Sequence, residues 1–135
     1  MKFSTRSSYG LRALAHLAKY YGNKPYSLAK VAQEEKISQA YLERLFSRLK
    51  KAGILVSSKG MAGGYQLARK PAQISILSVI EALEGTVSVF KCLGVRGDLI
   101  CSQKSCPSGF VYQKVQKALT DSLSSMTLND LIKNN

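Results

Sequence analysis

The amino-acid sequence predicts a mainly α-helical protein, a winged helix-turn-helix with a two-stranded wing and a long C-terminal dimerisation helix. Residues 37–68, ISQAYLERLFSRLKKAGILVSSKGMAGGYQLA, have a helical apolar period, a glycine stop and two strand patterns around a glycine-rich tip. The net charge of +12 falls mostly on the first 70 residues. Near the C-terminus, another long apolar period has little chain left to cover it, which indicates packing against a second subunit.

The first 36 residues predict two helices separated by a glycine and a proline. Ser4 caps the first helix, over residues 4–21, and Ser27 caps the second, over residues 28–36. Apolar side chains of the first helix recur on one face at helical spacing: Leu11, Leu14, Ala15, Ala18 and Tyr21. This face is expected to turn toward the core.

Residues 38–52 predict a third helix, capped by Ser38 and stopped by Gly53. Its apolar stripe consists of Leu42, Leu45, Phe46 and Leu49. Strands over residues 54–57 and 65–68 are expected to pair around the tip, because glycine tolerates the positive φ of tight turns. Two helices joined by a short turn are a weak sign of a helix-turn-helix, and the hairpin that follows makes the sign stronger.

The second half predicts a fourth helix, an irregular segment and a final long helix. Ser75 caps the fourth helix, which ends at Gly85, and residues 86–90 fit either a short strand or an extended linker. Residues 91–109 have no helical period and predict a loop. The final helix, residues 110–124, has its stripe at Phe110 or Val111, Val115, Ala118, Leu119 and Leu123, and the capping pair Thr127 and Asp130 precedes a last turn.

The expected organisation is therefore a DNA-binding domain over residues 1–72, a connecting helix and linker over 73–90, a cysteine-bearing sensor loop over 91–109, and a dimerisation helix with a C-terminal turn over 110–135. Folding of the last helix back onto the first is the alternative to dimerisation.

Composition favours a polyanionic partner. The chain has 20 Lys and Arg against 8 Asp and Glu, and neutralisation of phosphates by such side chains supplies most non-specific nucleic-acid affinity. The alternatives are a solubility surface or attraction to an anionic membrane. No apolar run approaches the length of a membrane span and the N-terminus lacks the apolar core of a signal peptide, so a soluble cytoplasmic protein without a membrane partner is expected. One histidine and no phosphate-binding loop argue against an enzyme.

Cys92, Cys101 and Cys106 are spaced C-x8-C-x4-C within fifteen residues. Soft thiolates suit zinc, Cu(I) or an iron-sulfur cluster, and zinc sites more often show C-x2-C pairs, which are absent here. An inert trio of thiols, or a redox pair with one cysteine left over, remain alternatives. The odd number and close spacing suit a reduced compartment rather than a disulfide framework.

Several segments in order, STRSSYGLRAL, ISQAYLERLFSRLKKAG, GMAGGYQLAR, ISILSVIEALEG and the cysteine segment, resemble the Rrf-two (Rrf2) family of winged-helix transcription regulators. The resemblance covers nearly the whole chain. It implies a dimeric bacterial repressor or activator that binds double-stranded operator DNA, with an iron-sulfur cluster that governs DNA binding. A 2Fe-2S cluster is favoured over a 4Fe-4S cluster.

The resemblance implies that the third helix enters the major groove and the hairpin reaches the minor groove or its phosphates. The expected contact residues are Ser38, Gln39, Ala40, Tyr41, Glu43, Arg44, Arg48, Lys59 and Gly60. Among them, Arg44 or Arg48 suits guanine or phosphate, and Gln39 suits adenine. Glu43 suits the amino group of cytosine, or else pairs with a neighbouring cation on its own helix.

Cys92, Cys101 and Cys106 are the expected cluster ligands, and the fourth is missing from the local pattern. The interval between the first two cysteines is long, and Gly109 stands where some relatives place a histidine. In other relatives the partner subunit's first helix completes the site, and His16 is the candidate here, with a core histidine as the alternative reading. A hydroxyl, Asp98, water or a small thiol are other candidates.

The sequence therefore predicts a bacterial transcription regulator controlled by cluster supply, iron, nitric oxide or redox state. A cluster-free thiol-switch repressor of the same fold is the closest alternative. A general nucleic-acid-binding or RNA-binding module without operator preference is a third.

Overall fold

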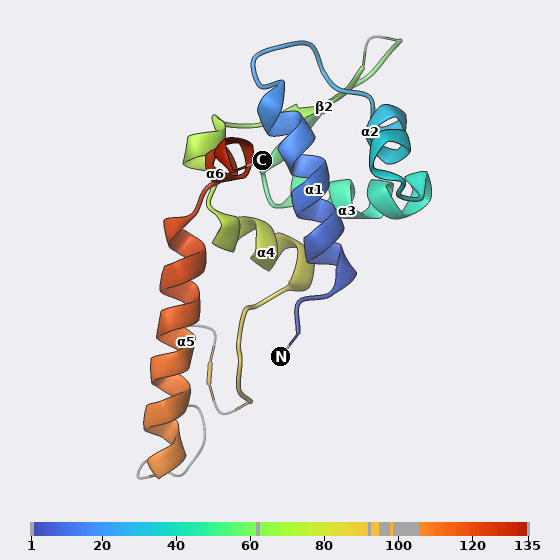
Figure 1. Cartoon of the computed structure of the whole chain (residues 1–135). Coiled ribbons are helices and arrows are strands. Elements are labelled where there is room, and N and C mark those ends of the chain that lie inside the picture. Colours follow the sequence, from blue (N-terminus) through green and yellow to red (C-terminus); the bar gives the residue numbers. More distant parts are fainter. Residues whose placement is uncertain (1, 62, 92, 95–97, 99–105, 135) are drawn as a thin grey trace.

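The computed structural model describes residues 2–61, 63–91, 93–94, 98 and 106–134. Figure 1 shows a compact helical body with a hairpin at one end and one long helix extending from the other. The elements in chain order are α1 (Thr5–Lys19), α2 (Leu28–Glu35), α3 (Gln39–Lys51), β1 (Leu55–Ser58), β2 (Gly64–Leu67), the 3-10 turn η1 (Pro71–Gln73), α4 (Ile76–Glu84), α5 (Pro107–Ser125) and α6 (Leu128–Lys133). The predicted fold class is confirmed.

The helices of the body begin where the sequence places small polar residues. The hydroxyls of Ser4, Ser27, Ser38 and Ser75 each accept a hydrogen bond from a backbone N–H in the first turn of α1, α2, α3 and α4. The predicted stripe of α3 is buried, with Phe46 and Leu49 fully inaccessible to solvent. These side chains pack with buried residues of α1, α2 and α4 in one core. The outer face of α3 is thereby fixed toward solvent.

The wing is an antiparallel pair in which Leu55 lies opposite Leu67 and Ser58 opposite Gly64. Both strands lie one residue from their predicted positions, β1 later and β2 earlier. Tyr26, just before α2, exchanges two backbone hydrogen bonds of 2.9 Å with Tyr65 of β2. The wing is therefore joined to the segment before α2 through the tip-proximal half of β2, in addition to following directly from α3.

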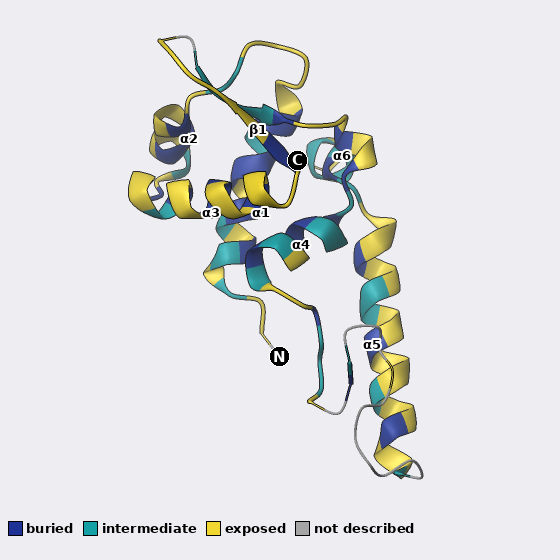
Figure 2. Cartoon of the chain, turned by 180° about the vertical axis from the view of Figure 1, so that it is seen from behind, coloured by how far each residue is buried: buried dark blue, intermediate teal, exposed yellow. Residues whose placement is uncertain are grey.

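The C-terminal elements do not show the alternative in which the last long helix folds back onto the first. It is α6 that packs against α1, whereas α5 packs against α4 and extends away from the body (Figures 1 and 2). A backbone bridge between Ser75 and Thr127 holds the start of α4 beside the start of α6. The predicted capping pair is confirmed, since Thr127 N–H donates to the Asp130 carboxylate over 2.8 Å.

The boundary of the predicted loop over residues 91–109 is wrong at its C-terminal end. Helix α5 begins at Pro107, three residues earlier than predicted, because proline has no N–H to lose at the first helical position and its φ is already helical. Residues 86–90 form no strand, which leaves the extended-linker alternative. Within the residues described, no helix is both long and apolar enough to cross a membrane.

Candidate nucleic-acid interface and sensor segment

The N-terminal half of α3 presents most of the predicted contact residues to solvent. Ser38, Gln39, Ala40, Glu43 and Arg44 are all exposed. Their common exposure follows from the burial of the apolar stripe on the other side of the same helix. The surface formed by these five residues is called the reading face below.

Tyr41 lies at the edge of the reading face and is half-buried. Its hydroxyl is 3.2 Å from the Thr5 hydroxyl, and its ring meets the Tyr9 ring edge to face with centroids 5.9 Å apart. Arg12 in turn lies over the Tyr9 ring, with its guanidinium carbon 5.5 Å from the centroid. Tyr41 thus connects α3 to α1 in addition to bordering the exposed surface.

Arg48 makes a contact within the fold that the sequence does not reveal. Its Nη1 donates a 2.9 Å hydrogen bond to the backbone oxygen of Leu83, near the end of α4. Helix C-termini leave carbonyl groups without an intrahelical donor, and a guanidinium satisfies one of them here. Arg48 therefore links the C-terminal half of α3 to α4. Arg44 lies one turn nearer the N-terminus of α3.

Glu43 is an acidic side chain on a basic surface. Among the residues that the structure describes, it forms no ion pair or hydrogen bond through its carboxylate. The alternative in which Glu43 pairs with a neighbouring cation on α3 finds no support in this geometry. Its carboxylate is free to meet a donor supplied from outside the chain.

The wing tip is narrow and basic. Lys59 is exposed and precedes Gly60, whose φ of +102° favours glycine. Gly63 N–H donates to the Gly60 carbonyl over 3.0 Å, which closes the tip. On the nearer side of the hairpin, the Lys50 amine donates to the Ser57 hydroxyl over 2.6 Å and ties the end of α3 to β1.

His16 is held by two carboxylates of its own chain. Its Nε2 lies 2.5 Å from Glu35 Oε1 and its Nδ1 lies 3.2 Å from Glu34 Oε2. Burial of Glu35 opposes ionisation, but hydrogen bonds from His16 and Arg12 outweigh it and lower the pKa of this carboxyl. A ligand role for His16 would require one ring nitrogen to leave its carboxylate. His16 is half-buried beside these two carboxylates and lies outside the hydrophobic core, so the core-residue alternative finds no support either.

Of the three predicted thiol ligands, Cys92 and Cys101 lie outside the described residues. Cys106 is half-buried at the N-terminal cap position of α5. The backbone N–H and hydroxyl of Ser108, with the N–H of Gly109, lower the pKa of the Cys106 thiol against a smaller opposing effect of burial. A lowered pKa increases the fraction of thiolate at a given pH, and the thiolate is the form that binds metal and reacts with oxidants.

Gln116 is a buried polar residue in the middle of α5, with 4% of its surface exposed. Its side-chain Oε1 accepts from Val89 N–H over 2.8 Å, and its Nε2 donates to the Val87 carbonyl over 2.5 Å. One side-chain amide thus provides a hydrogen-bond donor and an acceptor to the backbone of residues 87–89, as the backbone of a neighbouring strand would. Phe90 stacks on Tyr112 with centroids 4.0 Å apart. Together these contacts bind the linker that leads to Cys92 onto α5.

Glu84 joins the end of α4 to the start of α1. Its Oε1 accepts from the N–H and the hydroxyl of Ser4 over 2.8 and 2.6 Å and from the Ser7 hydroxyl over 2.7 Å. Its Oε2 lies 3.3 Å from Arg6 Nη2. Burial opposes ionisation, but these hydrogen bonds dominate and lower the pKa of Glu84 from 4.5 to about 2.

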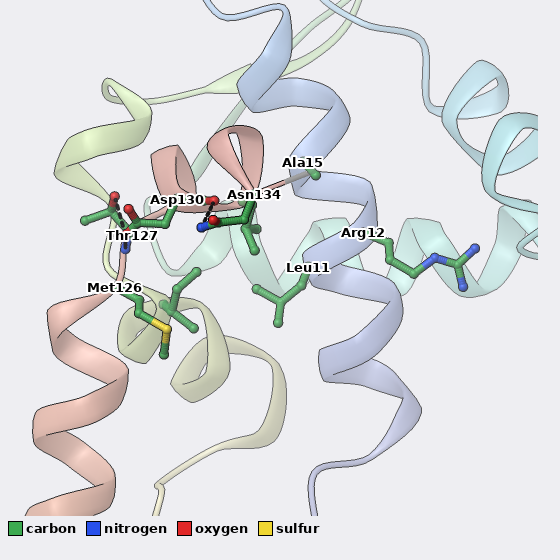
Figure 3. Close-up of a pocket in the computed structure, with 9 residues that line it drawn as sticks. Leu11, Arg12, Ala15, Met126, Thr127, Asp130 and Asn134 are labelled. Atoms are coloured by element: carbon green, nitrogen blue, oxygen red, sulfur yellow. Dashed lines mark hydrogen bonds between the residues drawn. The ribbon is translucent and has the colours of Figure 1, made fainter.

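An uncovered apolar surface runs between the start of α1 and the C-terminal helices. One hollow of about 390 Å³ lies among Phe3, Leu11, Ile80, Leu123 and Met126. A neighbouring one of about 360 Å³ continues past Leu11 and Met126 to Asp130 (Figure 3). Arg12, drawn in the same view, points away from this space toward α2. These two hollows and the adjoining side of α5 are called the apolar groove below.

An exposed face on the second helix of a helix-turn-helix, followed by a basic wing, defines a winged-helix DNA-binding protein. The family model described as "Rrf2: Iron-dependent Transcriptional regulator" matches residues 3–134. The chain belongs to the Rrf2 family of transcriptional regulators, as the resemblance predicted. Because the family comprises regulators, the expectation that the chain is not an enzyme is confirmed.

Individual relatives agree with this assignment. The chain is 34% identical to IscR of Vibrio vulnificus over 135 residues, which cover 100% of this chain and 79% of the relative. It superposes on CymR (YrzC), the global cysteine regulator of B. subtilis, with a TM-score of 0.83 and 33% identity, covering 100% of this chain and 98% of the other. For T. potens IscR the TM-score is 0.76 with 35% identity, covering 99% and 88%.

Proposed function

We propose that this transcription regulator binds its operator as a homodimer and that a thiolate-ligated iron-sulfur cluster on Cys92, Cys101 and Cys106 controls the binding. The 2Fe-2S form is favoured over the 4Fe-4S form. The observation that carries the proposal is a set of three cysteines within fifteen residues in a chain that matches a family model described as iron-dependent, with Cys106 at the start of α5, the helix to which Gln116 ties the linker. A change at the cysteines then acts on the same helix that joins the two subunits.

The apolar groove supports the homodimer. Helix α5 is 19 residues long, but only Gly109, Gln116 and Leu123 are buried. Val111 and Val115 are 52% and 43% exposed on the side of the helix that adjoins the groove, where Val115 lies with Phe3 around a smaller hollow. A second copy of the same helix would cover this side. Two linked DNA-binding domains would match a twofold operator.

The reading face and the wing would share the recognition of DNA. In the major groove, Gln39 would pair with adenine, Arg44 with guanine or a phosphate, and Glu43 with the amino group of cytosine. Ser38, Ala40 and Tyr41 would border these contacts, and Arg48 would support α3 through Leu83 while its charge attracts the phosphates. Lys59 and Gly60 would meet the minor groove or its phosphates. Glu43 then acts as a filter, because an unanswered carboxylate is repelled by DNA.

Two substitutions separate the roles of helix and wing. We expect Lys59→Ala to weaken binding to all duplexes by about threefold to tenfold and to reduce the salt slope by about one. We expect Glu43→Ala to relax discrimination at one base position, by about 1–3 kcal/mol. Fluorescence anisotropy on operator variants at several salt concentrations measures both. Lys133→Ala, an exposed lysine on α6, is the charge-matched control for Lys59→Ala. Equal losses on every duplex for both variants would contradict these roles.

The donor set fits a cluster in its chemistry. Three cysteines supply thiolates, and the described one, Cys106, lies where thiolate is favoured. A bound iron-sulfur cluster supplies a group that gains or loses electrons and is attacked by oxidants and nitric oxide. The chain's own contribution is to hold Cys106 at the N-terminus of α5 and to keep the linker before Cys92 on Gln116. A water, a small thiol or a side chain would fill the fourth position.

Anaerobic purification tests the cluster directly. We expect wild-type protein to contain iron and acid-labile sulfide and to absorb in the visible range. We expect Cys92→Ala, Cys101→Ala and Cys106→Ala each to lose most of the bound iron, and His16→Gln to retain it. Spectra and iron content that are unchanged in all three cysteine variants would contradict the cluster assignment while leaving operator binding intact.

A cluster-free thiol switch is the second candidate. The lowered pKa of Cys106 favours it equally, because a thiolate is also the nucleophile of disulfide exchange. The structural similarity to CymR, a global cysteine regulator, is compatible with a thiol switch. In this case the anaerobic protein contains no iron, and oxidation removes two hydrogens per chain as a disulfide forms, which mass spectrometry detects.

A further inference from the structure

We infer that Met61, at the tip of the wing, is a specificity-determining residue that enters the minor groove and wedges between two stacked base pairs. The inference rests on the proposed DNA-binding function and adds to it a contact of different chemistry. It predicts that the operator contains an easily unstacked step under each wing, which the protein selects through the deformability of the DNA.

Exposure is the first observation. Met61 is fully exposed, at 108% of the reference area, and is the most exposed of the large apolar side chains that the structure describes. Its described neighbours Lys59 and Gly60 are also exposed, and none of the described residues covers it. The segment SKGMAGG, which joins β1 to β2, therefore carries one large apolar side chain at the turn of the hairpin. Figure 1 shows this hairpin at one end of the body.

The small backbone of the tip is the second observation. A Cβ atom at Gly63 would collide with the backbone oxygen of Ser58 inside the turn, and one at Gly64 would collide with the backbone of Tyr26, in the segment before α2. Both positions are therefore restricted to glycine. Lys59 and Met61 are the large side chains between residues 59 and 64. An apolar contact made by the tip would therefore be made by Met61.

Chemistry gives the third step. Minor-groove proteins commonly insert an apolar side chain, methionine among them, between base pairs and so kink the duplex. Methionine is unbranched and polarizable, which suits a side chain that slides between flat rings. Lys59, two residues away, would lie near the phosphates that border the minor groove at the same step. Pyrimidine–purine steps unstack most easily, so the wedge would favour such a step at its position.

The support beneath the tip is rigid enough to deliver the wedge. Tyr65, one residue from the tip end of β2, exchanges backbone hydrogen bonds with Tyr26, and Lys50 ties β1 to α3. The position of Met61 is therefore set relative to the reading face. A wedge held at a fixed distance from the major-groove contacts selects a step at a fixed position in the operator.

The test uses the full-length protein and an operator selected from a random duplex library by the wild type. 2-Aminopurine placed at the step under the wing reports unstacking. We expect its fluorescence to rise with wild type and Met61→Leu, but not with Met61→Ala. We also expect that replacing the step by a stiff purine–purine step weakens wild-type binding about tenfold and Met61→Ala binding less than twofold. Lys59→Ala is the control that weakens binding but keeps the preference for the step.

The outcomes separate the inference from the function on which it rests. If wild type selects an operator and Met61→Ala retains the same step preference and fluorescence change, the wedge is wrong and the DNA-binding function stands. If wild type selects no operator, both are wrong. Circular dichroism of Met61→Ala is expected to match wild type, because the side chain makes no contact within the described fold.

Discussion

Val115→Glu is expected to convert the protein to a monomer at micromolar concentration and to weaken operator binding by about 100-fold or more. Val115 is 43% exposed, so a glutamate there remains hydrated in a single subunit and the fold is kept. In a pair, its carboxylate would be taken out of water beside Val111, Leu119 and Phe3 without a partner, which is costly. The large effect on DNA binding follows because two joined subunits bind the second half-site at high effective concentration. Sedimentation equilibrium and anisotropy measure the two effects.

Ser124→Glu is the matched control for this substitution. Ser124 is exposed on the other side of α5, near the ion pair of Lys117 with Asp121. The same new charge there is expected to leave the mass of a dimer and the operator affinity unchanged. A Val115→Glu protein that keeps the dimer mass would show that this side of α5 is not the subunit interface. A wild-type monomer at the same concentration would remove the homodimer altogether.

Glu84→Gln is expected to lower the free energy of unfolding by about 3 kcal/mol at pH 7. The folded pKa of about 2, against 4.5, corresponds to this amount at 1.36 kcal/mol per pKa unit. Because the folded pKa is depressed, the stabilisation is complete above about pH 5 and is lost as the pH falls toward 2. The difference between wild type and Glu84→Gln is therefore expected to shrink across this window. Denaturant unfolding followed by circular dichroism at several pH values measures it.

Glu81→Gln provides the control for the acid-dependent loss of stability. Glu81 is exposed on the same helix, and a surface substitution of this kind is expected to change stability by less than about 0.5 kcal/mol. A constant difference between wild type and Glu84→Gln from pH 7 down to pH 2 would contradict an ionised Glu84 in the folded state. The loss of stability in Glu84→Gln would then come from altered packing and hydrogen bonding and not from the lost charge.

Features that depend on local sequence were predicted well. Helix caps are formed by a residue and the two or three that follow it, so Ser4, Ser27, Ser38 and Ser75 identified the starts of four helices. The stripe of α3 was correct because a period of 3.6 residues fixes which side chains share a face. Since that face is buried, the residues of the reading face followed from it.

Features that depend on distant partners were missed. Periodicity assigns a glutamine such as Gln116 to solvent, whereas the backbone groups of Val89 and Val87 bond to its amide from 27 and 29 residues away. Glu84 serves Ser4 and Ser7 across about 80 residues. Arg48 was predicted to contact DNA, and its hydrogen bond to Leu83 could not be inferred because it joins two helices whose packing the sequence does not specify. The start of α5 is a different case, because the signal was local. Proline favours the first position of a helix, and Pro107 could have been used to predict the start of α5.

The two reciprocal hydrogen bonds between Tyr26 and Tyr65 determine how this protein could acquire a new target. They join the wing to the segment before α2, which packs against α3, so the fold holds the wing and the reading face in one arrangement. In the proposed complex, this arrangement would set the distance between the major-groove and minor-groove contacts. Exposed side chains such as Gln39 and Arg44 can therefore be exchanged without moving the wing. New operator preferences would arise by substitution of exposed side chains while the backbone stays the same. Operators with a different spacing between the major-groove and minor-groove contacts would not be bound.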